Sequence, residues 1–191
     1  MKIYQYNNYQ EYVNSQVEAN IRKIKNKWVE KKTIEEIYKR YKLAESIICH
    51  GTRNAAEQKY FQEFYPNAEI LGTEISHTAK DFPMTIQWDF HEDNPVWIDK
   101  FDIVYSNAFD HSYNPEKVLN CWKMQLKNNG RLFLEHGYGE TENISKQSDP
   151  LQIYEDELII LFNKVGLYLV DSFYSTGNKG ACPCKIYVLS K

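Results

Sequence analysis

Apolar residues near the N-terminus recur at spacings of three and four. They form one stripe that comprises Tyr12, Val13, Val17, Ile21, Ile24 and Trp28. This spacing predicts an amphipathic helix over 9–28, with lysine and arginine on its opposite face. Thr33, with Glu36 three residues later, has the form of a capping box and predicts a second helix from that point. We expect residues 1–42 to form a helical cap that precedes the main domain.

After residue 42 the pattern changes to short apolar runs that alternate with helical stretches. Strands are predicted at 46–49, 69–73, 84–88, 101–106 and 131–135, and helices at 54–64, 114–126 and 149–165. Such alternation is typical of a parallel sheet covered on both faces. Two further runs, 168–175 and 185–189, are too close together for a parallel crossover and predict a hairpin.

The predicted fold class is therefore α/β. We expect residues 43–191 to form a three-layer, Rossmann-like sandwich around a mostly parallel seven-stranded sheet. One antiparallel strand in the C-terminal hairpin completes this sheet, and the N-terminal helices precede it.

Charge and cysteine content exclude several classes of function. The formal net charge of −3 over 191 residues argues against a general nucleic-acid binder, which usually carries a basic excess. No run approaches the ~20 apolar residues that span a membrane, and the N-terminus lacks the apolar core of a signal peptide. We therefore expect a cytoplasmic protein. Of the four cysteines, only Cys182 and Cys184 are close, so no metal site is expected.

Polar residues follow four of the predicted strands, and ligands of open α/β sheets bind where parallel strands end. Glu74 comes 23 residues after Gly51, near the spacing of ~20 residues at which a carboxylate accepts hydrogen bonds from a ribose. Asp89 is placed to accept from an adenine amino group, with Phe90 packed on the base. The candidate cofactor residues are His50, through its backbone, and Gly51, Thr52, Arg53, Glu74, Ile75, Asp89, Phe90, Ser106 and Asn107.

The stretch FDIVYSNAFDHSYNPEKVLNCWKMQLKNNGRLFLEH, residues 101–136, resembles the fourth strand, following helix and fifth strand of class I S-adenosylmethionine-dependent methyltransferases. The C-terminal hairpin also matches this family, and the resemblance covers about 44–191. The whole sequence is similar to small bacterial methyltransferases of glycan and secondary-metabolite pathways. The resemblance implies S-adenosyl-L-methionine as cofactor and a small-molecule acceptor. The implied acceptor is an oxygen nucleophile on a glycan or capsule precursor, or a related anionic metabolite.

The first loop departs from the family pattern of an acidic residue followed by glycines at alternate positions. Cys49 stands where the acid is expected, and Arg53 and Ala55 replace glycines, which leaves only Gly51. The guanidinium of Arg53 offers a substitute, because its fork of donors suits the cofactor's carboxylate. The altered loop also leaves open a catalytically inactive partner subunit. A nicotinamide-dependent dehydrogenase is disfavoured, because the Gly-x-Gly-x-x-Gly run is missing.

Candidate catalytic residues follow the fourth predicted strand. His111 is the candidate general base, since imidazole titrates near neutral pH, and Asp110 is placed to orient it. The alternative is that His111 packs over the cofactor and bonds a loop carbonyl. Tyr113 and His136 are candidate substrate-binding residues.

The basic face of the first helix is a second candidate for substrate binding. If this helix lies over the active site, Lys25 and Lys27 attract an anionic acceptor, which needs no general base. The alternative is an ordinary solvated helix face. His77 and His91 are interpreted as surface residues.

Overall fold

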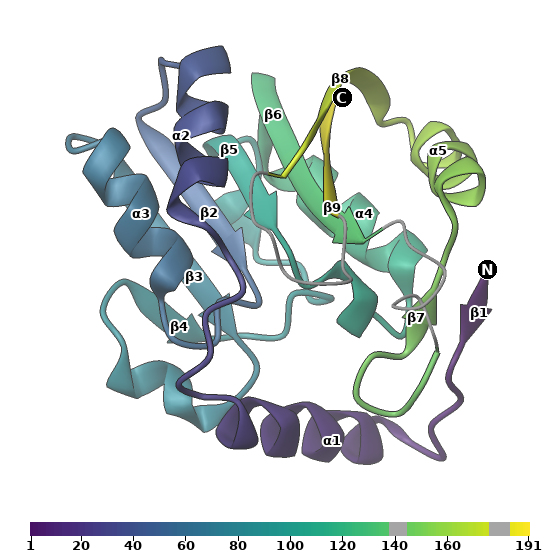
Figure 1. The fold of residues 1–191 in the computed structure, drawn as a ribbon. Coiled ribbons are helices and arrows are strands. Elements are labelled where there is room, and N and C mark those ends of the chain that lie inside the picture. The colour runs from purple at the N-terminus through teal and green to yellow at the C-terminus, as the bar shows by residue number, and fades with distance from the viewer. Residues whose placement is uncertain (138–144, 176–183) are drawn as a thin grey trace.

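Seven strands of the computed structural model form one twisted sheet (Figure 1), and the structure describes residues 1–137, 145–175 and 184–191. The strand order is β4-β3-β2-β5-β6-β9-β8. The bounds are β2 (Ser46–His50), β3 (Glu69–Glu74), β4 (Thr85–Gln87), β5 (Phe101–Ser106), β6 (Leu126–Gly137), β8 (Tyr168–Tyr174) and β9 (Cys184–Ser190). β9 pairs antiparallel with β6 and β8, while the other neighbouring strands pair parallel. The predicted mostly parallel sheet with one antiparallel strand is confirmed.

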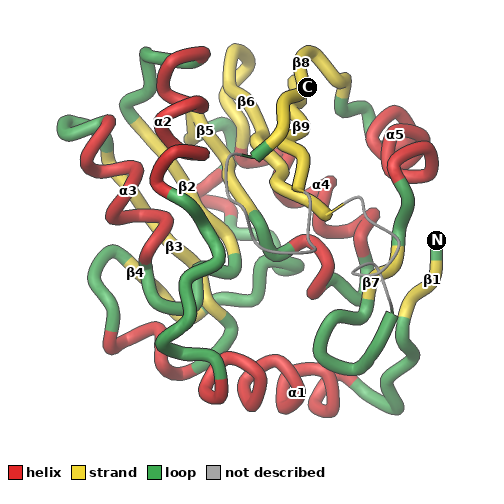
Figure 2. Tube along the Cα trace, in the orientation of Figure 1, coloured by secondary structure: helices red, strands yellow, loops and turns green. Residues whose placement is uncertain are grey.

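Helices cover both faces of this sheet (Figure 2). They are α2 (Lys31–Arg40), α3 (Ala56–Phe64), α4 (Pro115–Gln125) and α5 (Glu155–Lys164). Apolar side chains of α2 and α3 share one core cluster with the sheet, and those of α4 and α5 share the other. Because β2 is buried along its whole length, its near-continuous apolar sequence fits a strand packed on both faces. The predicted three-layer, Rossmann-like sandwich is confirmed.

The first helix, α1 (Tyr9–Arg22), is shorter than predicted and turns a polar face towards the protein. Its buried residues are Tyr12, Gln16, Ala19 and Asn20, whereas Ile21 of the predicted apolar stripe is 48% exposed. A surface helix usually buries its apolar face. The orientation of α1 therefore indicates that it faces a polar cavity and not the hydrophobic core.

The predicted helix over 9–28 is wrong beyond Arg22. Lys23 forms the C-cap of α1, and irregular backbone follows until α2. The predicted capping box is also wrong, because α2 begins at Lys31 and Thr33 lies inside it. Thr33 is buried, and its Oγ1 lies 2.9 Å from Oγ of Ser175. Its hydroxyl thus serves a tertiary contact instead of a helix end.

The helix predicted from Asp149 begins later, at Glu155. Residues Leu151–Gln152 form a short strand, β7, which pairs antiparallel with β1 (Lys2–Ile3). This pairing joins the N-terminus to the segment before α5 (Figure 1). Two-residue strands are too short to show an alternating pattern of apolar and polar residues, so the sequence does not predict them. Three short 3₁₀ helices complete the described elements: η1 (His77–Asp81), η2 (Pro95–Trp97) and η3 (Phe109–His111).

Helix α2 packs in the same layer as α3, while α1 lies across the carboxyl edge of the sheet (Figure 1). The division of the chain at residue 42 stays a prediction. Across the described ranges, no helix combines the length and apolar character needed to cross a bilayer. The cytoplasmic location also stays a prediction.

Candidate functional site

Two adjoining cavities lie at the carboxyl edge of the sheet. The smaller cavity measures about 50 Å³ and the larger cavity about 420 Å³. Lys23, Gly51, Arg53, Ala108 and His111 line both, so the two form one continuous site. The larger volume lies within the range of ~300–1,000 Å³ that is usual for small-molecule sites.

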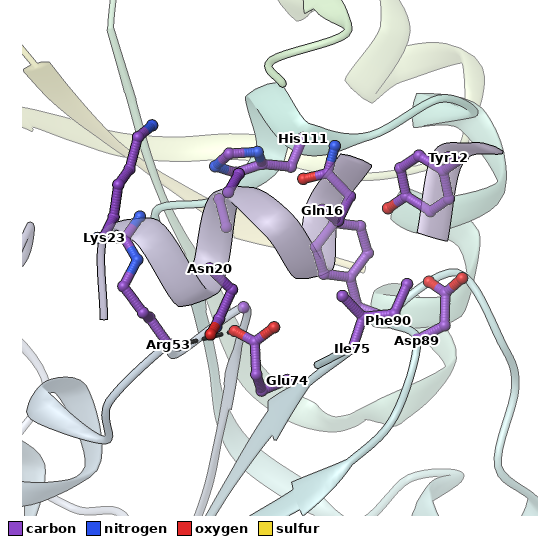
Figure 3. Close-up of a pocket in the computed structure, with 13 residues that line it drawn as sticks. Tyr12, Gln16, Asn20, Lys23, Arg53, Glu74, Ile75, Asp89, Phe90 and His111 are labelled. Atoms are coloured by element: carbon purple, nitrogen blue, oxygen red, sulfur yellow. Dashed lines mark hydrogen bonds between the residues drawn. The ribbon is translucent and has the colours of Figure 1, made fainter. Parts of the chain in front are cut away.

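The smaller cavity lies between α1 and the ends of β3 and β4 (Figure 3). Its other lining residues are Tyr12, Gln16, Ala19, Asn20, Glu74, Ile75, Asp89 and Phe90. By itself it holds only a few water molecules. It shares Ile75 and Asp89 with a third hollow of about 390 Å³ on its far side, so a ligand longer than the smaller cavity has room at both ends.

The loop after β2 lines both the smaller and the larger cavity. Gly51 has a φ of 72°, and a Cβ placed on it would lie 2.5 Å from Cβ of Ala108. Only glycine fits this close approach. Arg53 and Ala55 also have positive φ angles, of 43° and 61°, which non-glycine residues adopt rarely. The loop therefore keeps a glycine-like path although two glycines of the family pattern are replaced.

Glu74 ends β3 with its carboxylate fixed in the smaller cavity. Its Oε2 accepts from the amide of Arg53 at 2.9 Å, and its Oε1 accepts from the amide of Ser76 at 3.0 Å. Each carboxylate oxygen can accept a further hydrogen bond. The side chain is thus oriented by the backbone and still able to bind a hydroxyl.

Asp89, after β4, lies on the same cavity wall as Glu74. Its Oδ1 lies 2.7 Å from Nδ1 of His91, and its Oδ2 accepts from the Tyr9 hydroxyl at 2.9 Å. Burial acts to raise the pKa of Asp89, but hydrogen bonds from His91 bring it below its usual value. Burial lowers the pKa of His91, so this pair is a hydrogen bond between a carboxylate and a neutral imidazole. Asp89 is therefore ionised and partly engaged by protein groups.

His91 is buried, so its interpretation as a surface residue is wrong. Its Nε2 lies 3.0 Å from Oγ of Ser112, and its ring stacks on Tyr113 at 4.1 Å between centroids. His91 thus holds the Asp89 carboxylate in place through its hydrogen bond. His77 is exposed, as predicted.

Helix α1 contributes a buried amide to the smaller cavity. Asn20 accepts from the Thr78 hydroxyl at 2.9 Å through its Oδ1, while its Nδ2 has no partner within the described residues. The side chain points from α1 towards Glu74 (Figure 3). Because an unpaired buried donor is unfavourable, Asn20 is suited to donate to a ligand that also contacts Glu74.

The η3 helix places Asp110 and His111 at the larger cavity. Nδ1 of His111 lies 2.8 Å from the carbonyl oxygen of Ser148, and Nε2 lies 4.0 Å from Oδ1 of Asp110. A proton on Nδ1 donates to that carbonyl and leaves Nε2 as an acceptor. His111 thus has the geometry of a base, although it also makes the loop contact of the alternative interpretation.

Asp149 joins this group from the segment before β7. Its Oδ1 lies 3.6 Å from Nδ1 of His111, and its Oδ2 lies 2.8 Å from Nζ of Lys146. Burial acts to raise the pKa of Asp149, but His111 and Lys146 bring it below its usual value. Asp110, His111 and Asp149 offer ligand atoms within 4.8 Å of one another. The expectation of no metal site was based on cysteine spacing and does not cover this carboxylate–imidazole cluster.

His136, near the end of β6, lines the larger cavity from a buried position. Burial lowers its pKa, while a backbone hydrogen bond with Ile153 opposes this shift. Its Nε2 has no partner in the part of the chain that the structure describes. His136 therefore presents a neutral ring to the site.

Two buried glutamates complete the larger cavity. Glu57, at the start of α3, accepts from Nδ2 of Asn107 at 3.1 Å. Glu135, on β6, accepts from the Tyr105 hydroxyl at 2.6 Å and from the Ser175 hydroxyl at 2.7 Å. Carboxylates from β6, α3, η3 and the segment before β7 thus line the larger cavity.

Most of the predicted cofactor residues meet at these cavities, and two do not. His50 is buried beneath the loop, with its ring nitrogens 2.8 Å from Oγ1 of Thr73 and from Oε1 of Gln125. Its carbonyl accepts from the Ser106 hydroxyl, so His50 and Ser106 bond each other and line none of the three cavities. Burial lowers the pKa of His50 to about 4. The structure therefore shows both residues in contacts within the protein, and their assignment to the cofactor stays a prediction.

Three predicted substrate-binding residues also lie outside the cavities. Tyr113 packs on Tyr12 at 4.5 Å between ring centroids, and Lys25 and Lys27 are exposed beyond the end of α1. Lys23, at the end of α1, lines both main cavities. Because α1 ends at Arg22, six residues before the predicted end, Lys25 and Lys27 do not lie on this helix.

Sequence reasoning missed several cavity residues: Tyr12, Gln16, Asn20, Glu57, Lys146 and Asp149. The polar residues of α1 carried one available signal. Gln16 and Asn20 are four residues apart, which places them on one helix face.

No family model matches the sequence, and no curated protein matches it. Solved structures do match. A Burkholderia thailandensis 1,6-didemethyltoxoflavin-N1-methyltransferase with bound 1,6-didemethyltoxoflavin and S-adenosylhomocysteine has a TM-score of 0.79 at 12% identity, over 98% of this chain and 92% of that one. The O-methyltransferase of a Brevibacillus brevis trans-AT PKS multienzyme, in complex with S-adenosylhomocysteine, has a TM-score of 0.65 at 13% identity, over 99% and 82%.

The [4+2]-cyclase SpnF also matches, with a TM-score of 0.66 at 10% identity, over 95% of this chain and 94% of that one. This chain therefore has the fold of class I S-adenosylmethionine-dependent methyltransferases. At these identities the likeness establishes the fold, and the reaction has to be argued from the site.

Proposed function

We propose that this chain is an S-adenosyl-L-methionine-dependent methyltransferase that acts on a small polar molecule. One observation carries the proposal: the Glu74 and Asp89 carboxylates line one cavity with the Phe90 ring, and this cavity opens into a larger one that carries two histidines. The first arrangement suits a nucleoside, and the second suits an acceptor beside it.

The cofactor residues fit the group by their chemistry. Glu74 would accept from the ribose hydroxyls, and the unpaired Nδ2 of Asn20 would donate to the same sugar. Asp89 would accept from the adenine amino group through Oδ2, which it already shares with Tyr9. Phe90 and Ile75 would pack on the base. These polar groups are fixed by the fold before a ligand arrives, which reduces the entropy lost on binding.

When bound, the cofactor supplies an electrophilic methyl group next to the larger cavity. The protein has to hold the acceptor atom in line with that group and to exclude water. His111 would remove the acceptor's proton through Nε2, with Nδ1–H held by the Ser148 carbonyl. Asp110 would favour the protonated ring that results, and His136 would contact the acceptor.

The resemblance to glycan and secondary-metabolite enzymes favours an oxygen nucleophile on a glycan or capsule precursor. Lys23 and Lys146 support an acceptor with a negative group, because they bring positive charge to the larger cavity. Lys25 and Lys27 have no part in this arrangement.

Isothermal titration with S-adenosylhomocysteine tests the proposal directly. We expect saturable binding by the intact chain and about 100-fold weaker binding in Glu74→Ala. Conversion of S-adenosylmethionine to S-adenosylhomocysteine, followed over a panel of nucleotide sugars and small acids, then identifies the acceptor. No binding at high protein concentration would instead favour the inactive partner subunit.

A further inference from the structure

The loop after β2 has no acidic residue for the positive end of an amino acid. Cys49 occupies the position where the family has its acid, and it is buried in the core. Burial raises the pKa of the Cys49 thiol, so this side chain stays neutral. If the chain binds S-adenosylmethionine as proposed above, the α-ammonium of the cofactor needs another partner.

Glu57 has the position and an unused hydrogen-bond acceptor with which to bind the α-ammonium. It lies close to the start of α3, is buried, and lines the larger cavity together with Arg53. One carboxylate oxygen, Oε1, accepts from Asn107. The other, Oε2, has no hydrogen-bond partner among the residues with a described placement.

A buried carboxylate with one unpaired oxygen is unfavourable unless a positive group compensates it. The effect is visible in this side chain, because burial raises the pKa of Glu57 to about 7. Arg53 acts in the opposite direction on that pKa, but its guanidinium bonds the Asn26 carbonyl at 3.4 Å. The unpaired oxygen therefore still calls for a positive group, and Glu57 lines the cavity from which such a group can approach.

The other acidic groups of the larger cavity are already engaged. Glu135 accepts from two hydroxyls, and Asp149 pairs with Lys146. Asp110 is 42% exposed, so solvent screens its charge. Of these carboxylates, Glu57 combines full burial with an unpaired oxygen.

We propose that Glu57 binds the α-ammonium of S-adenosylmethionine and that Arg53 binds its α-carboxylate. Arg53 and Glu57 are four residues apart, at the junction of the β2 loop and α3. Their opposite charges match the zwitterion of an α-amino acid. Asn107 is a positioning residue that holds the carboxylate. This pair replaces the acidic residue that is missing at Cys49.

The experiment compares two ligands that differ only in the amino group. S-adenosylhomocysteine carries it, and 5′-S-(3-carboxypropyl)-5′-thioadenosine keeps the carboxylate but lacks it. Their dissociation constants are measured by titration calorimetry at pH 8 with the wild-type chain, Glu57→Gln and Glu63→Gln. Glu63 is a control on the exposed side of the same helix, where it pairs with Lys31.

We expect Glu57→Gln to weaken S-adenosylhomocysteine binding about 10- to 100-fold, as loss of a charged hydrogen bond does. Binding of the deaminated ligand should stay unchanged, and Glu63→Gln should alter neither. Equal losses for both ligands, or no loss for either, would overturn the assignment to Glu57 while leaving the proposed function intact.

Failure of the wild-type chain to bind either ligand would instead count against the proposed function. Thermal unfolding of each variant reports whether it folds. If Glu57→Gln does not fold, the wild-type comparison still tests whether the protein binds the ammonium at all. The deaminated ligand must bind at least about 10-fold more weakly than S-adenosylhomocysteine, and equal affinities would overturn the proposal.

Discussion

The backbone amide of Arg53 donates a 2.9 Å hydrogen bond to the Glu74 carboxylate and so joins the loop after β2 to the end of β3. The amide of Ser76 holds the other oxygen at 3.0 Å. Two backbone donors therefore orient the carboxylate that is proposed to bind the ribose. The positive φ of Arg53 accompanies this contact, which gives the strained backbone a role in the site.

Replacement of Glu74 by alanine should abolish this anchor. We expect the affinity for S-adenosylhomocysteine to fall about 100-fold, because hydrogen bonds to a buried charge are lost. 5′-Methylthioadenosine contains the same ribose and should lose the same factor in a parallel titration.

Glu69→Ala is the matched control for this change. Glu69 lies on the same strand but is 65% exposed, where it pairs with Lys100. An unchanged affinity in Glu74→Ala would remove Glu74 from the cofactor site.

The sheet and its covering helices could be predicted because strands and helices have distinct periods. The run at 101–106 was predicted with the bounds that β5 has, since buried parallel strands form unbroken apolar segments. The pair β1 and β7 could not be predicted, because two residues contain no period and their pairing joins distant segments.

The site was predictable only where it follows from strand ends. Glu74, Asp89 and Gly51 were found because parallel strands bring their carboxyl ends to one edge. Glu57 lies inside a helix, where an acidic side chain is ordinary and gives no signal, and for Asn20 the one signal is its spacing of four residues from Gln16. The burial of His50 could not be predicted, because its partner Gln125 is 75 residues away and only the fold shows that contact.

The two histidines of the larger cavity should differ in their kinetic effects. His111→Asn should lower kcat about 100-fold or more, because general-base catalysis contributes ~10²–10⁴. The dissociation constant of S-adenosylhomocysteine should stay unchanged. His136→Asn should act mainly on KM for the acceptor. Steady-state kinetics with the acceptor found in the screen give both numbers, and an unchanged kcat in His111→Asn would indicate an acceptor that binds already ionised.

Chelation should leave the activity unchanged despite the cluster of Asp110, His111 and Asp149. Nζ of Lys146 lies 2.8 Å from Asp149 and supplies the positive charge that a metal would bring. We expect turnover after dialysis against EDTA to remain within about twofold of the untreated enzyme, since a compensated carboxylate gains little from a second cation. Activity that falls on dialysis and returns with Mn²⁺ or Mg²⁺ would show that these three residues hold a catalytic metal.

Glu57 should make the stability of the ligand-free protein depend on pH in an unusual direction. Burial raises its pKa in the folded state from 4.5 to about 7. Because the pKa of Glu57 is higher in the folded state, its contribution to the unfolding free energy is complete below pH 4.5. This contribution is lost as the pH rises through 7. The shift corresponds to about 3 kcal/mol of unfolding free energy.

Glu57→Gln removes this titration, because an amide stays neutral. We expect the variant to gain roughly 2–3 kcal/mol over the wild-type chain between pH 5 and pH 8, as measured by urea unfolding without ligand. Glu63→Gln should show no such gain. Saturating S-adenosylhomocysteine should then reverse the order at pH 8, because its ammonium compensates the wild-type carboxylate and not the amide. A stability difference that is the same at both pH values would mean that Glu57 is not desolvated, and the physical reason for an ammonium at this position would be gone.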